Sequence, residues 1–145
     1  MIESDKTVER NVALIRRIPT EIFDDGNLDL IEELFDDEFV GYVPPVPGEL
    51  HGPEGFEQLV SAFRTGFPDL DHPEVHLIGA DDTVVARLTG TGTHEGEFLG
   101  VEPTGETMEV TAMEMYRVEH GAVTEGWLNV DMLGLLQQLG AVDSW

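Results

Sequence analysis

The chain has 145 residues, of which 30 are acidic and 7 are basic, and its formal net charge is −23. Such a charge repels phosphate backbones and anionic lipids, which argues against a nucleic-acid or membrane partner. The absence of cysteine excludes disulfides, thiol nucleophiles and metal–thiolate sites. The first residues lack the apolar core of a signal peptide and no apolar run could cross a bilayer, so we expect a cytoplasmic protein.

The acidic residues are spread along the chain rather than collected in a tail. They could belong to an acidic partner-binding protein or to a surface adapted to high salt, and the even distribution favours the second interpretation. In 1 M salt, charges are screened within roughly 3 Å. We therefore expect the unfolding temperature to rise between dilute buffer and molar KCl, as in a halophile's protein. An unfolding temperature that does not rise would contradict this hypothesis.

The N-terminal third predicts two helices separated by a turn. Residues 4–23 carry apolar side chains at helical spacing. Within them, Pro19 cannot donate a backbone hydrogen bond and should kink or restart the helix. Residues 25–27 (Asp-Gly-Asn) predict a stop followed by a new N-cap. Residues 28–35 then place their apolar side chains on one face, as a short helix does.

The middle of the chain predicts one short strand and one well-defined helix. Residues 37–43 predict the strand, which ends at the stiff, proline-rich loop 44–48. A helix should begin at Gly52, because Pro53 suits its first turn and is followed by an acidic residue. Four apolar residues would line its buried face: Phe56, Leu59, Val60 and Phe63.

From Asp71 onward the hydrophobic period changes from 3.6 residues to 2. Strands are predicted at 73–80, 83–94, 106–119 and 122–131, and a final short helix at 132–139. The turns at 81–82 and 120–121 should join neighbouring strands as hairpins. Helices followed by an antiparallel meander predict an α+β fold, with the helices packed on one face of the sheet, and we expect a single domain over residues 1–145.

Several familiar site patterns lack their structural context. Residues 90–92 (Gly-Thr-Gly) are followed by more strand instead of a helix, which excludes a dinucleotide loop. His72 and His76 have the spacing of a helical metal-binding pair. Pro73 and the alternating pattern place them on a strand, where that spacing favours ordinary surface histidines. We therefore expect no metal site.

The candidate functional residues are polar side chains inside otherwise apolar strands. Glu114 lies between two methionines and faces either solvent or a cavity, with the solvent position favoured in so acidic a chain. Trp127, Asn129 and Asp131 alternate and so point to one side of the last strand. If Trp127 marks the buried side, Asp131 is a carboxylate with a raised pKa, suited to acid/base chemistry. Asp131 is equally well placed to be the N-cap of the final helix.

Seven short segments follow one another along the chain in a characteristic order. They are GPEGF (52–56), FR (63–64), FPDL (67–70), GTHEGEFLG (92–100), PTG (103–105), YRVE (116–119) and DMLGLLQQLG (131–140). Together with Gly121 and Trp127, these segments resemble the SnoaL-like polyketide cyclase family of the NTF2-like superfamily. The similarity covers nearly the whole chain and carries more weight for the fold than for the function.

The resemblance implies an NTF2-like cone, formed by a bent sheet and three helices and often assembled as dimers or larger homo-oligomers. It also implies cofactor-free chemistry, in which a pocket acid/base removes a carbon-bound proton and a polyketide methyl ester closes a ring by intramolecular aldol condensation. In that scheme Asp131 is the acid/base. Tyr116 stands roughly where some members have an assisting histidine. His94 belongs to the characteristic loop, where it either faces the ligand as a further catalytic candidate or only fixes the loop.

The expected ligand is a small hydrophobic carbonyl compound. Five residues are expected to line its pocket: Trp127, Asn129, Glu114, Tyr42 and Arg87. Two non-catalytic alternatives stay open. The same cone can bind a small molecule without chemistry, with Asp131 as a cap only. It can also be an oligomerisation module whose interior is filled by Met113, Met115 and Trp127.

Overall fold

A computed structural model describes residues 2–143. Its helical segments are α1 (Ile2–Arg17), the π-helical η1 (Ile18–Asp24), α2 (Asp29–Leu34), α3 (Gly52–Gly66) and α4 (Met132–Gln138). Its strands are β1 (Phe35–Tyr42), β2 (Leu50–His51), β3 (Asp71–Ala80), β4 (Thr83–Thr93), β5 (Thr107–Glu119) and β6 (Ala122–Val130). Every predicted helix and strand is confirmed to within a few residues, and the two-residue β2 is the addition.

The predicted interruption at Pro19 is confirmed. The regular helix α1 ends at Arg17, and the wider η1 begins at Ile18 with Pro19 in its first turn. Proline has no backbone N–H, so it is tolerated best where a helix starts afresh. The restart turns four side chains of η1 into the interior: Ile18, Pro19, Ile22 and Phe23.

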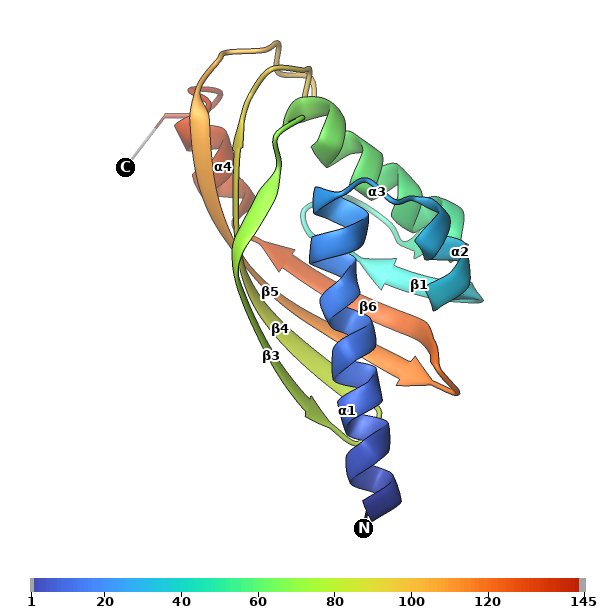
Figure 1. The fold of residues 1–145 in the computed structure, drawn as a ribbon. Coiled ribbons are helices and arrows are strands. Elements are labelled where there is room, and N and C mark those ends of the chain that lie inside the picture. Colours follow the sequence, from blue (N-terminus) through green and yellow to red (C-terminus); the bar gives the residue numbers. More distant parts are fainter. Residues whose placement is uncertain (1, 144–145) are drawn as a thin grey trace.

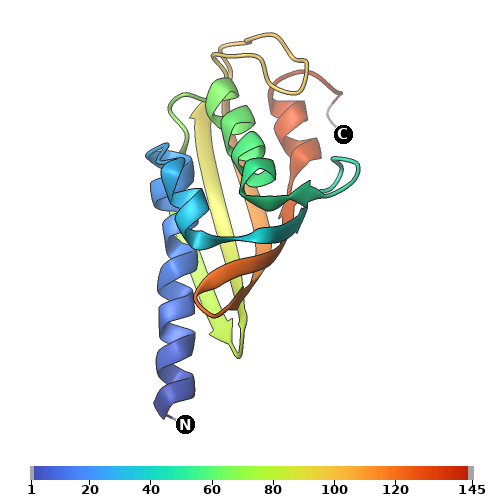
Figure 2. The ribbon, with the colours of Figure 1, turned by 90° about the vertical axis from the view of Figure 1, so that its right-hand side faces the viewer.

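The six strands form one sheet in the order β2-β1-β6-β5-β4-β3. Strands β3 to β6 make the predicted antiparallel meander. Strand β1 pairs in parallel with β6, so the sheet is mixed and its first strand lies beside its last. Figures 1 and 2 show a curved, open sheet with α1, α2 and α3 on one side of it. Between residues 2 and 143, no helix is both long and apolar enough to cross a membrane.

The core lies between the inner face of the sheet and these helices. Its centre is a group of phenylalanines in edge-to-face or tilted contact. The Phe56 ring lies 4.5 Å from Phe35, 5.8 Å from Phe23 and 5.9 Å from Phe39, measured between centroids. Full burial of one such side chain contributes about 1.5–3 kcal/mol. This cluster fixes α3 and η1 against the first strand and so positions the helical wall of the interior.

The loop between β4 and β5 folds back onto the end of α3. The backbone N–H groups of Glu95 and Gly96 both donate to the carbonyl oxygen of Gly66, at 3.0 and 3.2 Å. Phe98 is buried by this contact, and its ring lies 5.0 Å from Phe63 and 5.1 Å from Phe67. The loop therefore closes one end of the core.

Candidate functional site

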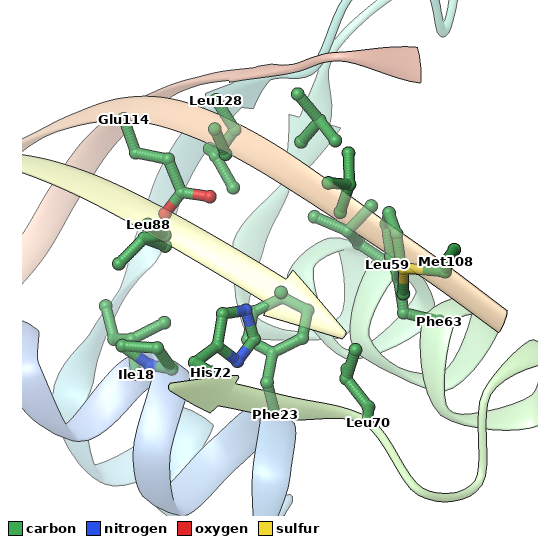
Figure 3. A pocket seen from close by; sticks show the side chains of 15 residues that line it. Ile18, Phe23, Leu59, Phe63, Leu70, His72, Leu88, Met108, Glu114 and Leu128 are labelled. Atoms are coloured by element: carbon green, nitrogen blue, oxygen red, sulfur yellow. The ribbon is translucent and has the colours of Figure 1, made fainter. Parts of the chain in front are cut away.

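An apolar pocket lies between the inner face of the sheet and the helical layer. Its walls are mostly aliphatic and aromatic, with Phe23 from η1, Phe63 from α3 and Leu128 from β6 among them. Two titratable side chains, His72 and Glu114, also line it (Figure 3). The pocket is narrow, with a cavity volume of about 40 Å³. Apolar walls with a few convergent polar groups are typical of small-molecule sites.

Glu114 reaches the pocket because of its register in β5. It pairs with Ala86 of β4 and Leu128 of β6, both of which are buried on the inner face of the sheet. Only 7% of Glu114 is exposed. This burial raises the pKa of the Glu114 carboxyl, although the Tyr116 hydrogen bond and the His72 charge act in the opposite direction. The site thus favours the neutral acid more than water does.

Tyr116 supports Glu114 from two residues further along the same strand. Its hydroxyl donates to Oε1 of Glu114 at 2.8 Å, and Tyr116 itself is 1% exposed. Burial raises the pKa of the Tyr116 hydroxyl well above its ordinary value, and the adjacent Glu114 charge and hydrogen bond raise it further. Tyr116 is therefore a fixed donor that orients the carboxyl, and it is not among the residues that line the pocket.

His72 enters the pocket from the first residues of β3 and is held by Asp24, the last residue of η1. The Nδ1 atom of His72 lies 2.7 Å from Oδ1 of Asp24, and its backbone N–H donates to Oδ2 at 3.0 Å. The two side chains are 12% and 14% exposed. Arg64 anchors this end of η1 by donating to the carbonyl oxygens of Phe23 and Asp24, at 2.6 and 2.9 Å.

The predicted inward side of the last strand is wrong. Leu128 and Val130 face the pocket, while Asn129 and Asp131 are exposed. Asp131 is the N-cap of α4, and its Oδ1 accepts a hydrogen bond from the Gly134 backbone N–H at 3.0 Å. The capping alternative is therefore confirmed. The acid/base role that the resemblance implied for Asp131 has no support from its position outside the pocket.

The prediction that Trp127 marks the buried side of the last strand fails, because local contacts stabilise Trp127 on the outer face of the sheet. Its ring stacks on Tyr42 of the neighbouring strand β1, with centroids 6.1 Å apart and an interplanar angle of 17°. The guanidinium of Arg117 lies 5.7 Å from the Trp127 ring centroid. An amphipathic indole packed in this way can occupy a solvent-facing sheet surface. Tyr42 and Trp127 are thus placed outside the pocket, contrary to expectation.

Arg87 also lies outside the pocket. It is exposed on β4 and pairs with Met113 of β5. Met113 is itself 53% exposed. Met115, two residues later, is exposed as well. The methionines therefore do not fill the interior, which removes the observation that would have favoured an oligomerisation module with a packed cone.

His94 is buried completely but does not line the pocket. Its Nδ1 accepts a hydrogen bond from the Thr104 backbone N–H at 3.1 Å and lies 2.9 Å from the Thr104 hydroxyl. Its ring lies 5.6 Å from Phe67. His94 therefore fixes the loop between β4 and β5, which was one of its two expected roles.

Of the predicted residues, the structure brings Glu114 and Tyr116 together and separates them from the rest. It adds His72, which the alternating pattern assigned to the surface, and Asp24, which no pattern distinguished. No signal in the sequence could have paired these two, since 48 residues separate them. Among residues 2–143, no three histidine or carboxylate side chains gather closely enough to hold a metal ion.

The curved sheet, with an apolar pocket between it and the helices, places the chain in the NTF2-like class of proteins. Within this class, residues 13–139 match the SnoaL-like polyketide cyclase family, and the chain belongs to that family. The aklanonic acid methyl ester cyclase DauD of Streptomyces sp. (strain C5) is 29% identical over 134 residues, which cover 89% of this chain and 81% of that protein. The corresponding cyclase DnrD of Streptomyces peucetius is 28% identical over 132 residues, covering 89% and 90%.

Solved structures agree with this assignment. A protein of Jannaschia sp. CCS1, classified as a SnoaL-like polyketide cyclase, superposes with a TM-score of 0.84 at 26% identity, covering 92% of this chain and 94% of that one. IdmH of Streptomyces antibioticus, classified as a polyketide cyclase, gives a TM-score of 0.77 at 31% identity, covering 90% and 98%. The NTF2-like fold that the sequence resemblance implied is therefore confirmed.

Proposed function

We propose that this chain is a cofactor-free acid/base enzyme of the polyketide cyclase type, acting on a small apolar compound with an activated carbon next to a carbonyl group. The observation that carries the proposal is the Glu114 carboxyl, which is buried in an apolar pocket with a raised pKa and is oriented by Tyr116. The cyclase relatives support ring closure as the overall reaction. The particular substrates of those relatives are not assigned to this chain.

Glu114 acts as the general acid in this proposal. Tyr116 donates to Oε1 of Glu114, which leaves Oε2 to carry the proton of the neutral acid. A ligand carbonyl oxygen beside Oε2 would receive this proton as the neighbouring carbon loses its own proton to a base in the same pocket. The resulting enol carbon then attacks a second carbonyl carbon and closes the ring. Such proton transfer contributes about 10²–10⁴-fold to rate.

The narrow pocket determines the choice of probe. Ethyl 2-methylacetoacetate is a small, neutral β-keto ester with one activated carbon-bound proton, so it reports the first proton transfer without requiring a large cavity. Exchange of this proton for deuterium in D2O is followed by proton NMR, with and without protein. Binding of the same ester is measured separately by saturation-transfer NMR.

The wild-type protein should accelerate the exchange, and Glu114→Gln should lower the protein-catalysed rate by about 10²–10⁴-fold. Glutamine keeps an oxygen for the Tyr116 hydroxyl, so binding should stay within a few-fold. Glu109→Gln is the matched control, because Glu109 is an exposed residue of the same strand. A wild-type protein that leaves the exchange rate unchanged would overturn the proposed function.

Asp131→Asn separates the two candidate carboxyl groups, because asparagine also serves well as an N-cap. The position of Asp131 outside the pocket leads us to expect that exchange persists in this variant. Loss of exchange in Asp131→Asn, together with an active Glu114→Gln, would transfer the acid/base role to Asp131 and refute the assignment to Glu114.

A further inference from the structure

The hydrogen bonds around His72 define which of its ring nitrogens carries a proton. The Asp24 carboxylate can only accept hydrogen bonds, so the 2.7 Å contact with Oδ1 requires a proton on Nδ1 of His72. In the neutral ring Nε2 is then an unprotonated lone pair. The second carboxylate oxygen accepts the His72 backbone N–H and fixes the strand relative to η1. Asp24 thereby holds both the tautomer and the orientation of the ring.

The free nitrogen of His72 faces the pocket. No described residue between 2 and 143 forms a hydrogen bond with Nε2 of His72, whereas Nδ1 is engaged by Asp24. Gly90 lines the pocket beside it, and a Cβ placed on Gly90 would lie 3.5 Å from Nε2. The missing side chain at Gly90 thus leaves Nε2 accessible from the cavity.

Among residues 2–143, charged side chains reach this part of the pocket from η1, α3 and β5. Asp24 contacts His72 from η1, and Arg64 of α3 binds the backbone carbonyl oxygens at the end of η1. Glu114 of β5 is the third, close enough for the His72 charge to act on its pKa. Figure 3 shows the Glu114 carboxyl and the His72 ring within the same pocket, projecting from different strands of the curved sheet.

We propose that His72 is the general base of this pocket, with Asp24 as its positioning residue and Glu114 as the opposing general acid. The inference rests on the proposed acid/base function and assigns the proton acceptor that the function requires. Asp24 and His72 follow the same logic as the carboxylate–histidine pair of a hydrolase triad, in which the carboxylate holds the tautomer. The comparison covers only these two residues, because the proposed reaction uses no nucleophilic side chain.

The proton transfers balance without an oxidant or a co-reactant. Nε2 of His72 takes the proton from the activated carbon, and the carbon–hydrogen electron pair forms the carbon–carbon double bond of the enol. Glu114 gives its proton to the carbonyl oxygen. When the enol carbon bonds to a second carbonyl carbon, the imidazolium gives its proton to the new alkoxide oxygen, and the enol hydroxyl returns a proton to Glu114. Both residues end in their starting states.

The first test needs no substrate. Long-range proton–nitrogen NMR of the full chain distinguishes a protonated Nδ1 from a protonated Nε2, and the wild type should show the Nδ1–H tautomer for His72. Asp24→Asn should reverse this assignment. Asparagine has one acceptor oxygen, and if this oxygen keeps the His72 backbone N–H, the amide N–H faces Nδ1 and moves the ring proton to Nε2. Asp25→Asn, at an exposed neighbour, should leave the tautomer unchanged.

The second test uses the exchange of ethyl 2-methylacetoacetate. His72→Gln should lower kcat by about 10²–10⁴-fold and Asp24→Asn by about 10–100-fold, with KM within a few-fold for both. The exposed His76 lies on the same strand, so His76→Gln is the matched control and should keep wild-type rates. Gly90→Ala keeps both residues but places a methyl group in contact with Nε2, and kcat should again fall.

The possible outcomes separate this inference from the proposed function. A wild type that catalyses exchange, with His72→Gln within threefold of it, would refute His72 as the base and leave the function standing. An Nε2–H tautomer in the wild type would also refute the inference. A wild type without any catalysed exchange would overturn the function and, with it, the catalytic role of His72. Loss of kcat together with the Asp24-dependent tautomer supports the proposal.

Discussion

Gly96→Ala should destabilise the fold by about 2–4 kcal/mol, because it breaks several contacts in one buried place. A Cβ on Gly96 would overlap the carbonyl oxygen of Thr65 and lie 2.9 Å from its carbonyl carbon. These are backbone atoms at the end of α3, so they cannot rotate away as a side chain would. The loop between β4 and β5 would have to lift from the helix.

Lifting the loop has two consequences for stability. The hydrogen bonds from Glu95 and Gly96 to the Gly66 carbonyl oxygen would be lost, each contributing about 1 kcal/mol. Phe98, which is buried against Phe63 and Phe67, would also become exposed.

Urea denaturation followed by circular dichroism measures the change in the free energy of unfolding. Gly90→Ala is a suitable comparison for stability, because its Cβ would meet His72 and Val110 only at ordinary contact distances of 3.5–3.7 Å. We expect Gly90→Ala to stay within about 1 kcal/mol of the wild type. Equal stabilities of Gly96→Ala and the wild type would show that the loop does not dock as described.

Glu114→Gln should make the protein more stable at pH 8 while it removes activity. Burial raises the pKa of the Glu114 carboxyl in the folded chain, whereas in the unfolded chain it titrates near its ordinary value of 4.5. Above pH 4.5 the folded chain therefore holds a proton that the unfolded chain has released. The stability of the wild type consequently falls as the pH rises from about 4.5 through the raised pKa, and the loss is complete above it.

The glutamine side chain is not ionisable, so the variant does not lose stability at this position as the pH rises. Its unfolding temperature should exceed that of the wild type at pH 8, and most of the difference should disappear at pH 4, where Glu114 is mostly protonated in both states. Glu109→Gln removes the same charge from an exposed site and should show no such pH-dependent gain. A gain of equal size at pH 4 and pH 8 would mean that Glu114 does not carry a raised pKa.

Stability gained as activity is lost would be typical of a functional site. A carboxyl group buried in an apolar wall is retained at a cost to folding, and acid/base chemistry is the ordinary reason for such a cost. The two measurements on Glu114→Gln therefore test the same feature in opposite directions.

Local patterns were sufficient to predict most of the secondary structure. The break at Pro19, the proline and acidic residue that begin α3, and the change to period 2 after Asp71 each act over a few residues, so a linear sequence contains them. The parallel pairing of β1 with β6 was not predicted. It joins segments about 85 residues apart, and neither segment alone specifies its partner.

The sequence by itself determined the family, the order of the elements and the presence of polar residues within apolar strands. The tertiary structure alone decided which of those residues face the pocket. An alternating strand has two equivalent sides, and a shift of one residue exchanges them. In the folded chain Trp127 stacks on Tyr42 outside the pocket, Asn129 and Asp131 are exposed, and Leu128 faces inward. Likewise, only the folded chain brings Asp24 to His72, because their contact spans 48 residues.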